Sequence, residues 1–181
     1  GFRKESIDEF DYVKDLCLTS NVIFEGINLN IPLYKIENNL SSDESVSRDL
    51  RYTFYRDLCL KYNTNYVILG HHGDDLVEGV YMRLTHGAYG RGLISMTPVS
   101  KSNYGFTVLR PLLNLSKSEI YDFSRSLNLL WYEDISNLDD KYTRNRYRNN
   151  IIPLLKLENP NLNKVILNYS KFKSEEEIYF D

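Results

Sequence analysis

The hydrophobic pattern changes its period once in the middle of the chain, and this change is the starting point for the fold prediction. Residues 66–69 are a short apolar run of strand-forming residues, which Gly70 ends. After Asp75 the apolar residues recur with the spacing of one helix face, at Leu76, Val77, Val80, Tyr81 and Leu84. The pattern predicts a strand that leads into a helix through a polar junction at 71–74.

This polar junction holds the first candidate functional residues. It reads His-His-Gly-Asp, and Asp75 and Glu78 follow on one face of the first turn of the helix. In open α/β sheets such a junction lies at the carboxyl edge, where ligands bind, and acidic residues there suit the positive end of the helix. Two interpretations stay open: a functional site, or a helix capped by Asp74 with solvated polar neighbours.

Similar patterns predict the other elements. Helices are expected at 6–20, 44–58, 116–128, 145–157 and 162–180, and strands at 22–33, 106–110 and, more weakly, 129–132. The buried side of the helix at 116–128 is expected to hold Ile120, Phe123 and Leu127. Segments 38–43, 95–105 and 133–140 are expected to be loops, and Ser-x-x-Glu capping boxes begin at Ser6, Ser41 and Ser116. The alternation of strands and helices predicts an α/β fold, a Rossmann-like parallel sheet with helices on both faces.

Composition excludes several classes of protein. With 181 residues, 42% hydrophobic and 26% charged, the sequence predicts one ordinary globular domain. It contains no apolar run long enough for a membrane span and no signal-peptide pattern. Cys17 and Cys59 both lie in helical patterns, which favours core residues in a reducing compartment over a disulfide. The absence of a CxxC motif in this sequence disfavours zinc and iron–sulfur sites.

A net charge of −3 gives no overall signal for nucleic acid, so any such contact must come from a local patch. The best candidate patch places four cations within residues 141–148: Lys141, Arg144, Arg146 and Arg148. This clustering favours phosphate contacts, with a solvated helix terminus as the alternative. Arg148 is expected at the helix surface. On the helix expected at 44–58, Arg51 is the other candidate.

Several of these segments resemble one family. Residues 71–78, Arg83 and residues 87–93 resemble the HHxDDxxET and RGxGxxGL segments of the tRNA(Ile)-lysidine synthetases, which are members of the ATP-pyrophosphatase, or PP-loop, group of nucleotide-binding α/β proteins. Residues 1–6, 48–52, 110–120 and 131–155 resemble their HGLRxES, RxxRY, RPLLxLSRxEI and WxEDxSNxxxxFxRNRxRxxxxPLL segments, in the same order. Gly79 departs from the pattern, because the family usually has Thr there.

The resemblance implies a tRNA-modifying ligase. Its reaction would adenylate the C2 carbonyl oxygen of the wobble cytidine in tRNA(Ile) with a CAU anticodon. The lysine ε-amine would then attack C2, and AMP would leave, to give lysidine. The implied cofactors are ATP and Mg²⁺, and the implied partners are this tRNA and free L-lysine, with no membrane. The resemblance is compatible with a homodimer and with a location in the cytoplasm of bacteria or in an organelle of bacterial origin.

The resemblance also implies roles for single residues. Asp75 and Glu78 would hold Mg²⁺ or the lysine ammonium group, and His72 and Asp74 would support the nucleotide. Arg51 and Arg144 are the further catalytic candidates. The residues expected to contact phosphate or RNA are Lys141, Arg144, Arg146 and Arg148.

The SGGxDS phosphate loop of the family has no counterpart in this sequence and would precede Gly1. Residues 1–157 are therefore predicted to be the later part of a PP-loop catalytic domain, and 158–181 a helix leading to a further domain. On its own, the chain is expected to be inactive and to bind ATP weakly or not at all.

Three alternatives stay open. A different tRNA-modifying ATP pyrophosphatase, such as a 2-thiolation enzyme, typically uses cysteine pairs, which this chain lacks. A non-catalytic remnant that binds RNA or a partner protein is compatible with the same sequence. A metal-binding module made of His71, His72 and Asp74 has little support, because adjacent histidines rarely both reach one ion.

Overall fold

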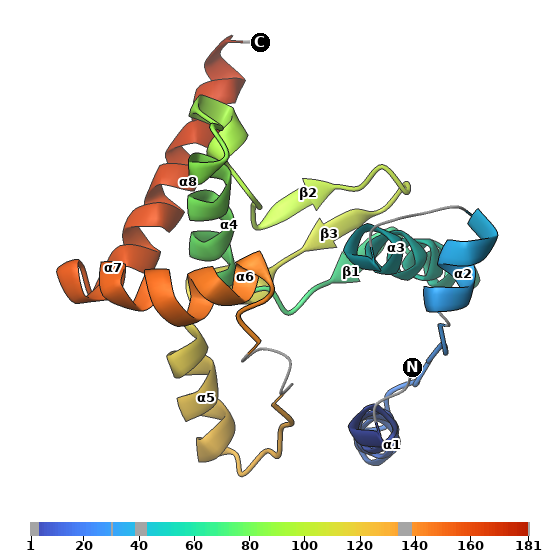
Figure 1. The fold of residues 1–181 in the computed structure, drawn as a ribbon. Coiled ribbons are helices and arrows are strands. Elements are labelled where there is room, and N and C mark those ends of the chain that lie inside the picture. Colours follow the sequence, from blue (N-terminus) through green and yellow to red (C-terminus); the bar gives the residue numbers. More distant parts are fainter. Residues whose placement is uncertain (1–3, 30, 39–42, 134–138, 181) are drawn as a thin grey trace. The chain divides into compact units, whose positions relative to one another are not determined.

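A computed structural model describes residues 4–29, 31–38, 43–133 and 139–180 of the chain. The chain divides into two compact units, Gly1–Asn65 and Tyr66–Asp181. Helices and a small sheet make up the fold (Figure 1), and the predicted α/β class is confirmed. In the described part of the chain, no helix is both long and apolar enough to cross a membrane.

The first unit is helical where it is described. It contains α1 (Lys4–Thr19), α2 (Ile31–Asn38) and α3 (Asp43–Lys61), and α2 packs against α3. The strand predicted at 22–33 is wrong, since residues 22–29 have no regular structure and α2 follows. Pro32 lies in the first turn of α2, where its fixed φ suits a helix and its missing N–H costs nothing.

Two predicted capping boxes belong to this unit. The box at Ser6 is wrong, because α1 already begins at Lys4 and Ser6 lies inside it. The box at Ser41 lies outside the described residues, and the helix behind it, α3, begins at Asp43.

The second unit contains the sheet. Strand β1 (Tyr66–Ile68) pairs in parallel with β3 (Thr107–Leu109), which pairs antiparallel with β2 (Val99–Lys101), so the order is β1-β3-β2. Strand β2 lies in a segment predicted as a loop. Its sequence lacks clear apolar alternation, and the hairpin to β3 depends on Gly105, whose φ of 88° favours glycine.

The remaining elements of the second unit are helical. After β1 comes α4 (Gly73–Thr85), and the 3₁₀ turn η1 (Gly90–Leu93) follows it. After the sheet come η2 (Pro111–Asn114), α5 (Lys117–Ser126), α6 (Thr143–Arg146), the π-helical turn η4 (Tyr147–Ile151), α7 (Ile152–Glu158) and α8 (Leu162–Phe180). The predicted helix on both sides of Pro153, the break at 159–161 and the terminal helix are confirmed.

Helix α5 keeps its predicted start but not its predicted burial. Ser116 Oγ accepts a hydrogen bond from the Glu119 N–H at 3.2 Å, and Glu119 Oε2 accepts one from the Ser116 N–H at 2.7 Å, which confirms this capping box. The predicted buried face is wrong, because Phe123 is 64% exposed and Leu127 53% exposed. Residues 129–132 form no strand.

Helix α4 is the centre of the core of the second unit, and α8 lies along it (Figure 1). One cluster of buried side chains joins it to η2 and α8: Leu76, Val80, Leu113 and Leu167. A second cluster joins it to η4, α7 and α8: Val77, Tyr147, Ile152 and Leu162. Because α4 is packed on both of these sides, the residues of its first turn are held in fixed positions.

Close packing against Ser95 favours glycine at position 79. A Cβ there would lie 2.5 Å from both Cβ and Oγ of Ser95. We expect Gly79→Ala to lower the melting temperature, because overpacking costs roughly 1–3 kcal/mol and outweighs the gain of about 1 kcal/mol in helix propensity. In a Ser95→Gly background the same change should stabilise the protein. A higher melting temperature for Gly79→Ala alone would contradict this account.

Candidate active site at the start of α4

The strand-to-helix junction predicted from the sequence is present in the structure. The Leu69 N–H donates to Leu109 O at 2.9 Å, which extends the pairing of β1 with β3, and the Gly73 N–H donates to Leu115 O at 2.7 Å. A Cβ at Gly73 would lie 2.9 Å from Leu115 O, so this close approach of two backbones requires glycine. The junction therefore holds Asp74, Asp75 and Glu78 in fixed positions at the start of α4.

Glu78 is a buried carboxylate held by two arginines. It is 2% exposed. Its Oε2 accepts a hydrogen bond from Arg144 Nε at 2.8 Å and one from Arg148 Nη2 at 3.1 Å, and its Oε1 accepts one from Arg148 Nε at 2.7 Å. Such charge-assisted bonds are short and strong, and they compensate for the cost of burying the charge.

Asp75 belongs to the same carboxylate and arginine cluster, which consists of Asp75, Glu78, Arg144 and Arg148. Its Oδ1 accepts from Arg144 Nη2 at 3.0 Å and from Arg148 Nη2 at 3.3 Å, while its Oδ2 accepts from the His72 N–H at 3.0 Å. Asp75 therefore accepts hydrogen bonds from the backbone N–H of His72, just before α4, and from both guanidinium groups. The spacing of Asp75 and Glu78, read from the sequence, does place them on one face.

The two arginines reach α4 from α6 and η4. They are four residues apart, which places them on one side of this helical stretch. The prediction that Arg148 lies at the helix surface is wrong, because its side chain is only 25% exposed and pairs with both carboxylates. Burial alone would lower the pKa of Arg148, but the hydrogen bond and charge of Glu78, with Asp75 and Asp74, raise it above its usual value.

Asp74 does not cap α4 but binds two other elements. It accepts hydrogen bonds from the Lys117 N–H at the start of α5, at 2.6 Å, and from Lys156 Nζ of α7. Burial alone would raise the pKa of Asp74, but these bonds and the charges of Lys156 and His72 hold it below its usual value. Lys156 is a site residue that the sequence analysis missed. Its only signal is its place directly after the matched 131–155 segment.

His72 lies beside both aspartates without a direct hydrogen bond from its ring to either. Its Nδ1 is 3.8 Å from Asp74 Oδ2 and its Nε2 is 3.5 Å from Asp75 Oδ2. Within the described residues, Nδ1 is buried and has no hydrogen-bond partner. The ring thus lies between Asp74, which the resemblance assigned with His72 to the nucleotide, and Asp75, which it assigned to Mg²⁺ or lysine. The nucleotide-binding role of His72 stays a prediction.

The other predicted cations do not join this cluster. Arg146 is exposed, and it donates to Asp140 O at 2.9 Å, Lys141 O at 3.0 Å and Thr143 Oγ1 at 3.0 Å, so it holds the turn before α6 together. Lys141 is exposed on that turn. Arg51 lies on α3, in the first unit, and its catalytic role stays a prediction.

The arrangement does not fit a metal ion at Asp75 and Glu78. Their oxygens accept hydrogen bonds from guanidinium groups, which occupy the positions that a cation would need. In the residues that the structure describes, no group of three or more His, Cys, Asp or Glu side chains could hold a metal. The chemistry that this geometry does offer is a pair of fixed guanidinium groups suited to an anionic ligand.

Comparisons with known proteins identify the family of the chain. A family model described as the PP-loop domain matches residues 1–155. The tRNA(Ile)-lysidine synthase of Geobacillus kaustophilus is 36% identical over 178 residues, which is 98% of this chain and 38% of that protein. The enzyme of the same name from Bacillus subtilis is 35% identical over 173 residues, which is 96% of this chain and 36% of that protein.

A solved structure shows a similar fold. The U34-tRNA thiolase NcsA from Methanococcus maripaludis, with its 4Fe-4S cluster, matches 94% of this chain and 57% of that chain with a TM-score of 0.66 at 16% identity. The chain belongs to the PP-loop domain family, as its motifs predicted. Both of these bacterial relatives are tRNA(Ile)-lysidine synthases, and the chain spans less than two fifths of their length.

The low pKa of Asp74 predicts an acid-sensitive contribution to stability. A carboxyl whose folded pKa lies below its unfolded value of about 3.9 stabilises the fold above that pH and loses this effect as the pH falls through the folded pKa. We expect Asp74→Asn to lower the melting temperature at neutral pH, with a difference from the wild type that shrinks below about pH 4. Asp122→Asn, in an exposed ion pair, is the control. A difference that is constant with pH would contradict the assignment.

The burial of Glu78 predicts a large cost for its neutralisation. Glu78→Gln leaves two arginines without their main partner, and we expect the free energy of unfolding to fall by about 3 kcal/mol. Chemical denaturation would measure this loss, with Glu158→Gln on the exposed end of α7 as the control. Adding Arg148→Met should recover part of the loss. If Glu78→Gln is as stable as the control, the carboxylate does not hold the arginines as described.

Proposed function

We propose that this chain takes part in the ATP-dependent ligation of lysine to C2 of the wobble cytidine of tRNA(Ile), through an adenylated tRNA intermediate. The observation that carries the proposal is the pair of arginines that Asp75 and Glu78 hold at the carboxyl end of β1. It is supported by the 36% identity to a protein named tRNA(Ile)-lysidine synthase. ATP, tRNA(Ile) and L-lysine are the proposed substrates, and the proposed enzyme is a C–N ligase.

The arginine pair suits the electrostatic demands of this reaction. Adenylation and the loss of AMP both build negative charge on phosphate oxygens, and cations fixed in advance stabilise that charge without reorganising. Arg144 keeps 42% of its side chain exposed, and its bonds to the carboxylates use Nε and Nη2. We infer that Arg144 is the guanidinium that meets the phosphate, and that Arg148 acts mainly by fixing the carboxylates.

This proposal changes the role of the carboxylates. Asp75 and Glu78 act as positioning residues for Arg144 in the described state, rather than as ligands of Mg²⁺. Asp74 likewise ties α5 and Lys156 to the start of α4. We propose that Mg²⁺ takes part only as the ion bound to ATP, and we assign no residue of this chain to it. The lysine ammonium group could reach Glu78 only by replacing an arginine.

A 2-thiolation enzyme is the second candidate function, because the chain shares its fold with the thiolase NcsA. Iron–sulfur clusters are held mainly by cysteine thiolates, usually four of them. This sequence has two cysteines, the half-buried Cys17 on α1 and the buried Cys59 on α3. Neither lies near the carboxylate and arginine cluster in sequence. The cysteine content therefore favours the ligase over a cluster-dependent thiolase.

The test uses the natural full-length protein, rather than residues 1–181 alone, with tRNA(Ile), ATP and labelled lysine. We expect lysidine formation by the wild type, and a loss of roughly 10²-fold or more in kcat for Arg144→Ala, as for the removal of a fixed donor to a developing anion. Arg125→Ala is the matched control, because Arg125 pairs only with the exposed Asp122 in the bonds found for it. Sulfur incorporation without lysine incorporation would instead support the thiolase.

Salt dependence separates phosphate contact from structure. If Arg144 neutralises a tRNA phosphate, Arg144→Ala should weaken tRNA binding. The slope of log K against the logarithm of the salt concentration should become shallower by about 0.9 units. Arg146→Ala should change the slope less than Arg144→Ala, since Arg146 donates its hydrogen bonds to the backbone of its own turn. An unchanged slope and turnover for Arg144→Ala would refute its assignment.

A further inference from the structure

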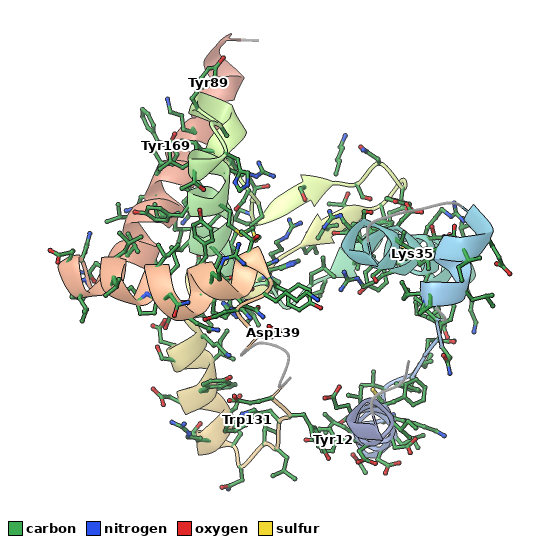
Figure 2. All side chains as sticks on the ribbon, viewed as in Figure 1. Tyr12, Lys35, Tyr89, Trp131, Asp139 and Tyr169 are labelled. Atoms are coloured by element: carbon green, nitrogen blue, oxygen red, sulfur yellow. The ribbon has the colours of Figure 1, made fainter. Side chains whose placement is uncertain are left out.

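An ordered stack of side chains lies outside the carboxylate and arginine cluster. Lys117 Nζ is 5.0 Å from the centre of the Tyr121 ring, and the rings of Tyr121 and Trp131 stack with centroids 5.3 Å apart and planes 18° apart. The Tyr121 hydroxyl donates to Glu133 Oε1 at 3.1 Å. Figure 2 shows Trp131 beside α5. These contacts fix the plane of an indole that belongs to a segment without regular secondary structure.

The stack is not part of a hydrophobic core. None of the residues of α5 is buried, and Trp131 is 39% exposed. Tyr121 covers one face of the indole, and 39% of Trp131 remains accessible outside that contact. Tryptophan has the largest apolar surface of any side chain, and leaving it in water gives up the stabilisation that burial would supply. A ring that is oriented but open on one face has the geometry needed to stack on a planar ligand.

The stack is joined to the site through α5. The Lys117 N–H donates to Asp74, and Tyr121 follows one turn later, roughly 6 Å along the helix axis. A ligand on Trp131 would therefore lie beside the helix whose first N–H is bonded to Asp74. Nucleotides combine a planar base with a phosphate group, so they match an aromatic face and a nearby cationic site together.

We propose that the open face of Trp131 is a stacking platform for an unpaired nucleobase. Tyr121 acts as the positioning residue that orients the indole, and Lys117 places a cation at the end of the stack nearest Asp74. The base can belong to a single-stranded RNA loop or to a free adenine nucleotide. The choice of RNA as a source rests on the proposed function, whereas the stacking geometry itself does not.

Trp131 can report on its own ligand. It is the only tryptophan in the 181 residues, and the difference between the wild type and Trp131→Phe isolates its emission in the intact protein. The probes are AMP, ATP, an RNA hairpin with an unpaired loop, and a fully paired duplex of the same composition. We expect saturable quenching by the hairpin or by the nucleotides and none by the duplex, because paired bases have no open face.

Variants test whether the stacking contributes to binding. Trp131→Ala should weaken binding of the quenching probe roughly tenfold or more, as expected for the loss of one stacked base, and Trp131→Phe should retain part of the affinity. Isothermal titration calorimetry measures these affinities, because neither variant keeps the indole that reports by fluorescence. Phe123→Ala is the control, since it removes an exposed ring from the same helix on a different side from Tyr121. Thermal melting of each variant shows whether it is folded.

Each outcome decides the proposal. Quenching by the nucleotides assigns the platform to a free nucleotide, and quenching by the hairpin alone assigns it to RNA. No quenching by any probe, or unchanged affinity in Trp131→Ala, overturns it. Lysidine formation without quenching would refute the stacking role of Trp131 and leave the proposed function intact. Quenching in a protein that forms no lysidine would support the stacking role and refute the proposed function.

Discussion

The pairing of Glu78 with Arg144 and Arg148 is the interaction on which the arrangement of the second unit depends. A carboxylate with 2% exposure in the first two turns of a helix would be strongly destabilising without partners. The two guanidinium groups come from residues 66 and 70 positions further along the chain. Satisfying Glu78 therefore requires α6 and η4 to lie against the start of α4, and this requirement selects one packing of these helices.

The neighbouring carboxylates extend the same constraint to further elements. Asp75 binds the backbone at the start of α4 as well as both arginines, while Asp74 binds the start of α5 and Lys156 of α7. Three acidic residues within five positions thus fix four helical segments around one end of the sheet. The apolar clusters around Leu76 and Val77 supply the burial free energy, and the ionic contacts determine which residues meet.

The sequence predicted the local features of this site well. The change in periodicity at 66–84 located the strand, the helix and the polar junction, because each signal lies within a few residues of the next. The spacing of Asp75 and Glu78 correctly placed them on one face. What could not be predicted was their partner, because no local pattern shows that Arg148 folds back onto Glu78. The π-helical turn at 147–151 also changes which side chains face α4, and periodicity based on 3.6 residues does not anticipate it.

The errors elsewhere have similar physical causes. Residues 22–33 are rich in strand formers but have no described strand beside them, and propensity alone does not make a sheet. Strand β2 was missed because it gains its structure from pairing with β3, not from its own pattern. The apolar pattern correctly predicted the helix α5. The prediction that its apolar face is buried was wrong. An amphipathic pattern indicates a face that suits burial, but it does not identify what covers it.

The ionic cluster also limits how the site can act. A guanidinium group has five N–H donors, so Arg144 can keep its two bonds to Asp75 and Glu78 and still present donors to a phosphate. The carboxylates bound to Arg144 lower the net positive charge around it, which weakens its long-range attraction for an anion. They also fix the orientation of its guanidinium group. Arg148, less exposed and bonded to both oxygens of Glu78, is less suited to meet a ligand directly. The same pairs that hold the fold together therefore leave one arginine of the two in a position to bind an anion, and this asymmetry is set by burial rather than by residue type.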